Sequence, residues 1–168
     1  MKISIKKTLL FVAAFFGLAA FIMFFLSPLA FNLDFGMLGK STTNLKFSEV
    51  YFNSTIEFEG LKLGETVGAT LSIIGYLLIL LNAVLFALLG LGKVKKGKKA
   101  KVNYLSLIIC IPALVGILFV FLTKSNWISA NELKDSAELY SLGIGPILGG
   151  VFGLLSAIIG AFGLLSKK

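Results

Sequence analysis

Four long runs without a charged residue dominate the hydrophobic pattern of the chain. They cover residues 8–31, 66–92, 102–123 and 139–166. A helix needs roughly 20 apolar residues to cross the hydrocarbon core of a bilayer. The runs are too long and too continuously apolar for the alternating strands of a membrane barrel. The pattern therefore predicts an all-α membrane protein, a single domain with a four-transmembrane-helix bundle.

The first run has features of both an uncleaved anchor and a signal peptide, because Lys2, Lys6 and Lys7 precede it. Its apolar core is longer than the roughly 7 to 15 residues that are usual for a signal peptide. A cut after Ala30 would place Pro28 at the third position before the cut, where a small residue other than proline is expected. An uncleaved membrane anchor is the favoured interpretation.

The connection over residues 32–65 is long and alternates between apolar and polar positions. Alternation with a period of two is typical of short strands that have one apolar face. We therefore expect a small strand-containing loop, with a turn at Asn53 and Ser54 and a strand that bends at Gly60. The apolar positions of this pattern, which we expect to form a recognition surface, are Leu45, Phe47, Ile56 and Phe58.

The connection over residues 124–138 is shorter and carries three acids, each three residues from the next. Residues three apart share one face of a helix. These acids are Glu132, Asp135 and Glu138. They predict either a solvated helical cap or a site for a cation or a partner.

Composition narrows the class of protein further. Hydrophobic residues make up 57% of the chain and charged residues 14%, whereas about 25% of the residues of a soluble domain are charged. The chain has no His and one Cys, Cys110, and all its basic residues are Lys. The commonest general base, a Cys-rich metal site and a guanidinium clamp are therefore missing. We expect a protein that is not an enzyme and has no metal or cofactor.

The charges are divided unequally between the connections. Most of the Lys residues lie near the two termini and in the loop 93–101, and all eight acids lie in the connections 32–65 and 124–138. By the positive-inside rule, both termini and the Lys-rich loop face the cytoplasm, and the other two connections are outer loops of a cell-membrane protein. Tyr104, Trp127 and Tyr140 stand near the expected headgroup depth, where we expect them to act as interface anchors.

The cytoplasmic loop concentrates positive charge in nine residues. Its Lys residues are Lys93, Lys95, Lys96, Lys98, Lys99 and Lys101. Each Lys close to an anionic surface adds about 1 kcal/mol of attraction, so we expect contact with anionic lipid headgroups. Docking of an acidic cytoplasmic partner is the alternative. No aromatic residue is interleaved with these Lys residues, so nucleic acid is not expected as a partner.

The fourth run carries small residues at a strict spacing of four: Gly145, Gly149, Gly153, Ala157 and Ala161. Such a strip allows close helix packing, either inside one chain or against another chain. Asn82 is the strongest polar group within the runs, and no Asp, Glu or Lys accompanies it there. Membrane-embedded charges commonly mark coupled transport, which is therefore disfavoured. Asn82 is expected to form a hydrogen bond between helices or, alternatively, to line a pore.

This layout of four helices, a longer first outer loop with strands and a shorter second one is similar to that of claudin-like tetraspan proteins. The first outer loop has no Trp or Cys, so the resemblance implies topology alone. The leading hypothesis is a structural or accessory subunit that binds a protein partner, or a second copy, through its outer loop and its small-residue helix face. The alternative is a small oligomeric channel or uncoupled transporter.

Overall fold

The computed structural model describes residues 4–58, 61–92 and 108–166. Long helices alternate with short strands and turns along the chain. The helices are α1 (Ile5–Ile22), α2 (Phe47–Tyr51), α3 (Thr70–Gly90), α5 (Ile111–Phe121), α6 (Thr123–Ala130) and α7 (Ile144–Leu165). The strands are β1 (Leu29–Asp34), β2 (Lys40–Asn44), β3 (Ser54–Phe58), β4 (Leu61–Thr66) and β5 (Tyr140–Leu142). The 3-10 turns are η1 (Met23–Phe25), η2 (Gly36–Leu38), η3 (Ile108–Cys110) and η4 (Lys134–Leu139).

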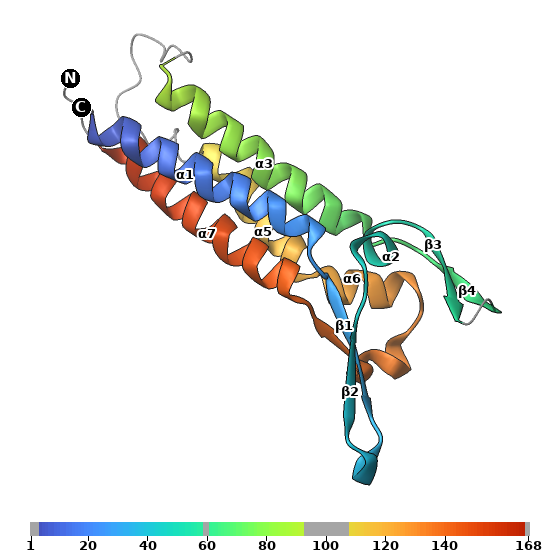
Figure 1. Cartoon of the computed structure of the whole chain (residues 1–168). Coiled ribbons are helices and arrows are strands. Elements are labelled where there is room, and N and C mark those ends of the chain that lie inside the picture. The colour runs from blue at the N-terminus through green and yellow to red at the C-terminus, as the bar shows by residue number, and fades with distance from the viewer. Residues whose placement is uncertain (1–3, 59–60, 93–107, 167–168) are drawn as a thin grey trace.

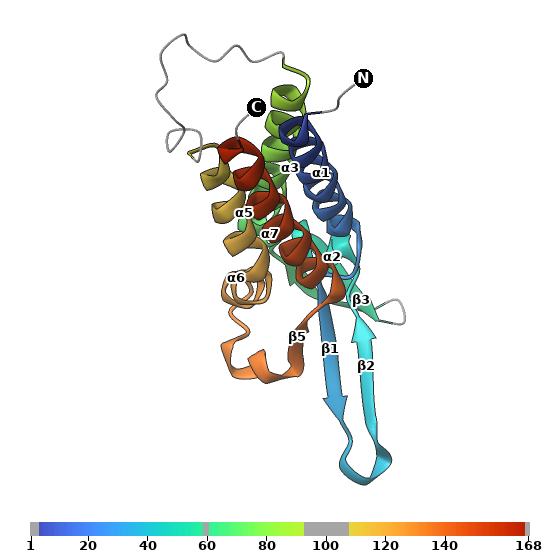
Figure 2. The same ribbon diagram turned by 90° about the vertical axis from the view of Figure 1, so that its left-hand side faces the viewer.

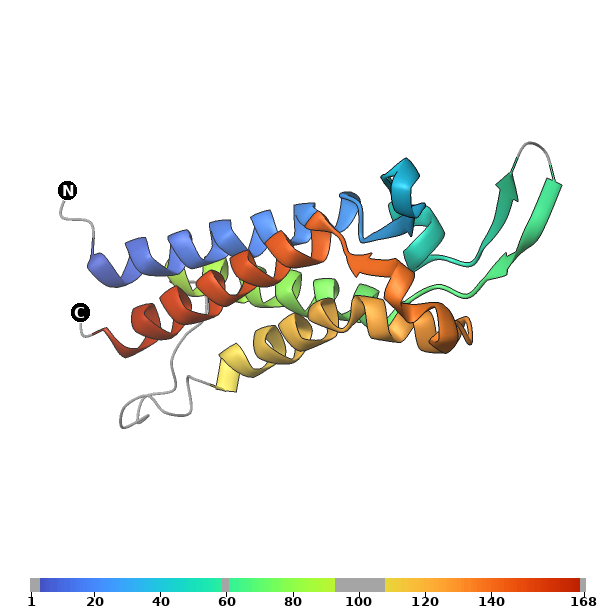
Figure 3. The ribbon, with the colours of Figure 1, turned by 90° about the horizontal axis from the view of Figure 1, so that it is seen from below.

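Four helices, α1, α3, α5 and α7, run side by side as a bundle (Figure 1). Both α1 and α5 pack against α3 and α7. The start of α1 and the end of α7 lie at one end of the bundle, and all strands lie at the other end (Figures 1 and 3). Among the described residues, three helices, α1, α3 and α7, are long and apolar enough to cross a membrane, or four if α5 and α6 form one bent span. The prediction of a helical membrane protein is confirmed at this level.

Two of the predicted spans are too long at the outer end. The first helix ends at Ile22, a 3-10 turn carries the chain to Phe25, and Leu29–Asp34 forms strand β1. Pro28 stands just before this strand, and a proline has no backbone N–H to donate inside a helix. The fourth helix begins at Ile144, because Tyr140–Leu142 pairs with β1 as strand β5.

The third predicted span is bent at the end nearest the strands. Helix α5 ends at Phe121, and α6 continues from Thr123 at an angle of 57° to the preceding segment. Helix α6 therefore lies across the end of the bundle instead of continuing along it (Figure 1). This bend buries Trp127, which is 1% exposed and contacts the ring of Tyr140 at 5.1 Å. Trp127, which we expect to act as an interface anchor, is therefore buried inside the protein.

Strands from both outer connections join in one antiparallel sheet of order β2-β1-β5. Phe31 is aligned with Thr43 on one side and with Tyr140 on the other. Strands β1 and β2 extend well beyond β5 as a two-stranded hairpin that points away from the helices (Figure 2). The prediction of strands in the first outer loop is confirmed, but the partner strand from the second loop was not expected.

A second hairpin, β3–β4, projects in a different direction (Figure 3). Its strands pair from Ser54 with Thr66 to Phe58 with Leu61, with an irregularity between Ile56 and Glu57. The chain therefore reverses between two strands, and the expected single strand that bends at Gly60 is wrong. The turn expected at Asn53 and Ser54 is also wrong, because Ser54 already begins β3.

One of the two buried clusters of the described residues runs from the bundle into the elements at the end that carries the strands. We call residues 29–67 and 123–142, as far as they are described, the cap. Val50, Tyr51, Trp127 and Ile128 of the cap belong to the same buried cluster as Tyr76 and Ile117 of the helices. The cap is therefore packed onto the bundle by apolar contacts of the kind that stabilise a protein interior.

Candidate functional site

The small-residue strip of α7 faces the interior of the bundle and receives large side chains. A Cβ added at Gly149 would lie 2.8 Å from the ring of Tyr76, and one added at Gly160 would overlap the ring of Phe86. Both rings come from α3 and are fully buried. Ala161 is partly buried against the cluster that contains Phe86. These glycines thus provide space for aromatic rings across the bundle.

The other members of the strip also face neighbours in the same chain. A Cβ at Gly145 would lie 2.8 Å from the carbonyl oxygen of Met23, and one at Gly153 would lie 2.8 Å from Ile117. Ala157 is 4% exposed. The strip is occupied by the chain's own helices, so these five positions do not present an open face to a second chain.

Asn82 is fully buried between helices of the bundle. Its side-chain Nδ2 donates a hydrogen bond to the carbonyl oxygen of Ile109, at the start of the third helical segment. Its Oδ1 has no hydrogen-bond partner among the described residues. This contact ties α3 to the turn η3 within one chain.

Helix α2 closes the outer end of the bundle. Tyr51 is 1% exposed, stacks on Phe24 at 4.6 Å between ring centroids and contacts the ring of Tyr76 edge-on at 6.0 Å. Loss of water around the phenol raises the pKa of Tyr51 to about 12. The Lys46 N–H donates to Glu49 Oε2 at 2.8 Å and caps this short helix.

The apolar residues predicted as a recognition surface have another role where their side chains are described. Leu45 and Phe47 pack against the buried core. Phe47 begins α2 and is not in a strand, so its alternation with polar neighbours was misleading. Ile56 and Phe58 lie in β3, but their side chains are outside the described part of the chain, and so is the whole Lys-rich loop 93–101.

Helical structure in the second outer loop is present as α6 and η4. Asp135 and Glu138 lie in η4, a 3-10 turn, while Glu132 precedes it with a positive φ of 56°. The three acids therefore do not share one regular helix. In the described ranges, no three acidic or Cys side chains are grouped so that they could hold a metal ion.

Polar side chains cross-link the strands of the β1–β2 hairpin. Asn32 of β1 accepts a hydrogen bond from Thr42 of β2 at 2.9 Å and donates one to Ser141 of β5 at 3.0 Å. One side chain thus joins all three strands.

Asn131 links the two long connections in a similar way. Its side chain accepts a hydrogen bond from the Val67 N–H at 2.7 Å and donates one to the Val67 carbonyl at 2.9 Å.

The turn of this hairpin is well defined, and we call its residues 35–39 the hairpin tip. The Gly36 N–H donates to Asp34 Oδ1 at 3.0 Å, and the Phe35 N–H donates to the Gly39 carbonyl at 2.9 Å. Gly36 and Gly39 have φ values of 62° and 97°, which glycine adopts without steric cost. This turn leaves two large apolar side chains exposed on the surface.

Those side chains are Phe35, which is 54% exposed, and Met37, which is 107% exposed. They lie at the end of the hairpin that is farthest from the helices (Figure 2). The sequence pattern missed them, because two apolar residues flanking a glycine have no periodic repeat. The signal that could have found them is the pair Gly36 and Gly39, which marks a tight turn between strands.

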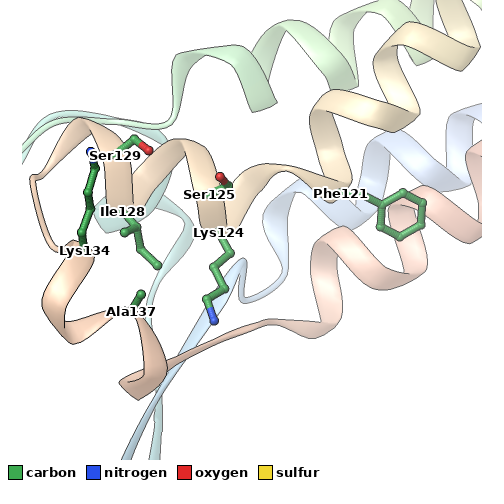
Figure 4. Close-up of a pocket in the computed structure, with 7 residues that line it drawn as sticks. All are labelled: Phe121, Lys124, Ser125, Ile128, Ser129, Lys134 and Ala137. Carbon is green, nitrogen blue, oxygen red and sulfur yellow. The ribbon is translucent and has the colours of Figure 1, made fainter.

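A pocket of about 430 Å³ lies beside the bend between α5 and α6 (Figure 4). Its walls come from the end of α5, one face of α6 and the turn η4. The residues that line it are Phe121, Lys124, Ser125, Ile128, Ser129, Lys134 and Ala137. The lining contains two Lys ammonium groups, two Ser hydroxyls and three apolar side chains. The sequence pattern did not indicate this pocket.

Comparison of the chain with protein-family models, curated proteins and solved structures gives no match. The geometry of the cap and its pocket is therefore the basis for the functional argument.

Proposed function

We propose that this is a non-enzymatic, four-span protein of the cell membrane that acts as a structural or accessory subunit. It binds a protein partner with the hairpin tip on the outer side. In this proposal α5 and α6 belong to one bent span, and both termini and the loop 93–101 face the cytoplasm. The distribution of Lys supports this orientation, and so does the position of the start of α1 and the end of α7 at one end of the bundle.

The observation that carries the proposal is the exposure of Phe35 and Met37 on a hydrogen-bonded turn. Full burial of one large apolar side chain is worth about 1.5–3 kcal/mol relative to exposure in water. A side chain that a hydrogen-bonded turn keeps in water gains this free energy of burial only when a partner covers it. The hydrogen bonds of Asn32 and of the turn also reduce the ordering cost of binding.

The channel hypothesis has less support from the same structure. Asn82 is bonded to Ile109 within the chain, and Tyr51 and Tyr76 fill the outer end of the bundle with buried rings. A path along the axis of one chain would have to pass these side chains. The small-residue strip of α7 is occupied internally as well, which leaves the hairpin tip as the better contact surface.

The test is purification of the tagged chain in a mild detergent from its native membrane, followed by mass spectrometry of the proteins that remain bound. We expect a stoichiometric second protein with the native chain. The double variant Phe35→Ser/Met37→Ser should lose it by at least about 10-fold, because two apolar contacts are removed.

Val67→Ser is the matched control, because Val67 is 50% exposed on the same cap but lies away from the hairpin. It should retain the partner. Purification of the native chain without a second protein, or full retention of the partner by the double variant, would contradict the proposal.

A further inference from the structure

We propose that the pocket between α6 and η4 binds the anionic headgroup of a phospholipid at the outer surface of the membrane. The inference requires only that the helices are embedded in a bilayer, and it does not depend on the protein partner of the hairpin tip. It also concerns the opposite end of the bundle from the end of α3 and the end of α7 at Leu165.

The first argument is position. Phe121 is the last residue of α5, and the chain turns by 57° into α6 directly after it. Helix α6 carries Lys124, Ser125, Asn126 and Ser129 and is too polar for the hydrocarbon core. The pocket therefore lies where an apolar helix gives way to a polar one, which is the depth of lipid headgroups.

The second argument is the chemistry of the lining. Ser125 and Ser129 are one helical turn apart on α6, so their hydroxyls lie on the same face. Lys124 and Lys134 add two ammonium groups, and neither forms an ion pair with a carboxylate in the described part of the chain. Ammonium and hydroxyl donors together are suited to an anion with several acceptor oxygens, such as a phosphodiester.

The third argument distinguishes a lipid from a water-soluble anion. The side chains of Leu114, Leu118 and Phe121 are 51%, 56% and 38% exposed, and they follow one another at helical spacing down α5. They form an apolar track that leads from the pocket into the membrane. An amphiphile can place its headgroup in the pocket and an acyl chain along this track, whereas a free phosphate would use the polar part alone.

The two Lys side chains occupy different ends of the pocket (Figure 4). Lys124 extends from α6 near the bend, and Lys134 lies beside Ser129 at the far end, with Ile128 and Ala137 between them. Lys124 is nearer to the apolar track, so we assign the phosphate to the ammonium group of Lys124, which points away from the Ser125 hydroxyl (Figure 4). Lys134 and Ser129 then contact the polar part of the headgroup that extends beyond the phosphate.

The experiment uses the full chain in nanodiscs of phosphatidylcholine and phosphatidylglycerol, with a trace of phosphatidylglycerol that carries a photoreactive group next to the phosphate. After irradiation, labelled peptides are identified by mass spectrometry. We expect labelling within residues 121–137. The double variant Lys124→Gln/Lys134→Gln should lower it about 10-fold, because two attractive charges are lost.

Three comparisons make the result specific. Lys40→Gln removes a cap Lys that already pairs with Asp34 and should leave the labelling unchanged, and Lys124→Arg/Lys134→Arg should retain it. Excess glycerol phosphate in the buffer should not compete. Absent labelling of residues 121–137, equal labelling of the Gln variant, or efficient competition by glycerol phosphate would each overturn the assignment to a lipid.

Discussion

Large apolar side chains are exposed in two regions of this protein, the outer faces of the long helices and the hairpin tip. Phe15 and Leu81 on the helices are 67% and 50% exposed, and Phe35 at the tip is 54% exposed. The exposure is similar but the surroundings differ. Lipid chains cover the helical side chains at no hydrophobic cost, whereas water around Phe35 and Met37 imposes that cost in full.

This comparison shows why exposure alone does not mark an interaction site in a membrane protein. Helices are stable in the bilayer because they expose apolar side chains to the lipid chains. At the hairpin tip, the same kind of surface stands outside the helices on a polar hairpin whose strand β2 is exposed along its whole length. Apolar exposure at the hairpin tip is therefore the feature that supports the proposed partner.

The largest difference between the two regions is expected in membrane insertion, when a Lys is introduced into each of them. Leu81→Lys places a charge on the lipid-facing side of α3, which costs about 2.5–3.5 kcal/mol at the centre of a membrane helix. The yield of inserted, monodisperse protein should fall strongly. Met37→Lys should leave insertion and the melting temperature unchanged. An equal loss for both variants would show that the hairpin tip is buried in lipid.

The pH dependence of stability tests whether the cap seals the bundle from water. The pKa of Tyr51 is raised from 10.0 to about 12 in the folded protein. Between these values the unfolded chain releases the phenolic proton and the folded chain keeps it, so the folded state loses stability as the pH rises. At about 1.4 kcal/mol per pKa unit, the loss from this group amounts to about 2–3 kcal/mol at pH 12.

Tyr51→Phe removes this contribution and keeps the ring. The melting temperature of the variant should therefore fall less than that of the native chain between pH 10 and 12, and the two should agree closely at pH 8. Lys titration is common to both proteins and cancels in the comparison. Parallel curves for the two proteins would show that water reaches Tyr51.

The smallest effect is expected at the base of the hairpin tip. Lys40 and Asp34 form an ion pair at 3.2 Å, but their side chains are 80% and 57% exposed. Such pairs contribute about 0–1 kcal/mol because water and salt screen them. Lys40→Gln should leave the melting temperature and partner retention unchanged. A marked loss of the partner in this variant would assign binding to the charges and not to Phe35 and Met37.

The helices could be predicted from the sequence, because a long charge-free run has one stable form in a bilayer. Their outer ends could not. The apolar run continues through Leu29 and Phe31 into β1 without a change of composition. Pro28 stops the helix locally, but the continuation of the run as a strand depends on pairing with β5, more than 100 residues away in the chain, and no local pattern records such a contact.

The candidate site was less predictable than the fold. The strip from Gly145 to Ala161 was recognised by its spacing, but the spacing does not say whether a backbone or an aromatic ring fills it. Tyr76 and Phe86 do so from across the bundle. The pocket at Lys124 depends on the bend between α5 and α6. This bend brings side chains of α5, α6 and η4 together, and no pattern in the sequence predicts it.

The most direct test of the central claim measures whether the hairpin tip is covered in the native membrane. Met37→Cys in a Cys110→Ala background gives one thiol at the tip, and Ser41→Cys in the same background gives one on the exposed strand β2. Both are treated with a membrane-impermeant maleimide in intact cells and again after purification in detergent. We predict that the thiol at position 37 is protected from the maleimide in cells and reacts with it after purification. The thiol at position 41 should react under both conditions. Full reactivity of position 37 in intact cells would contradict this prediction.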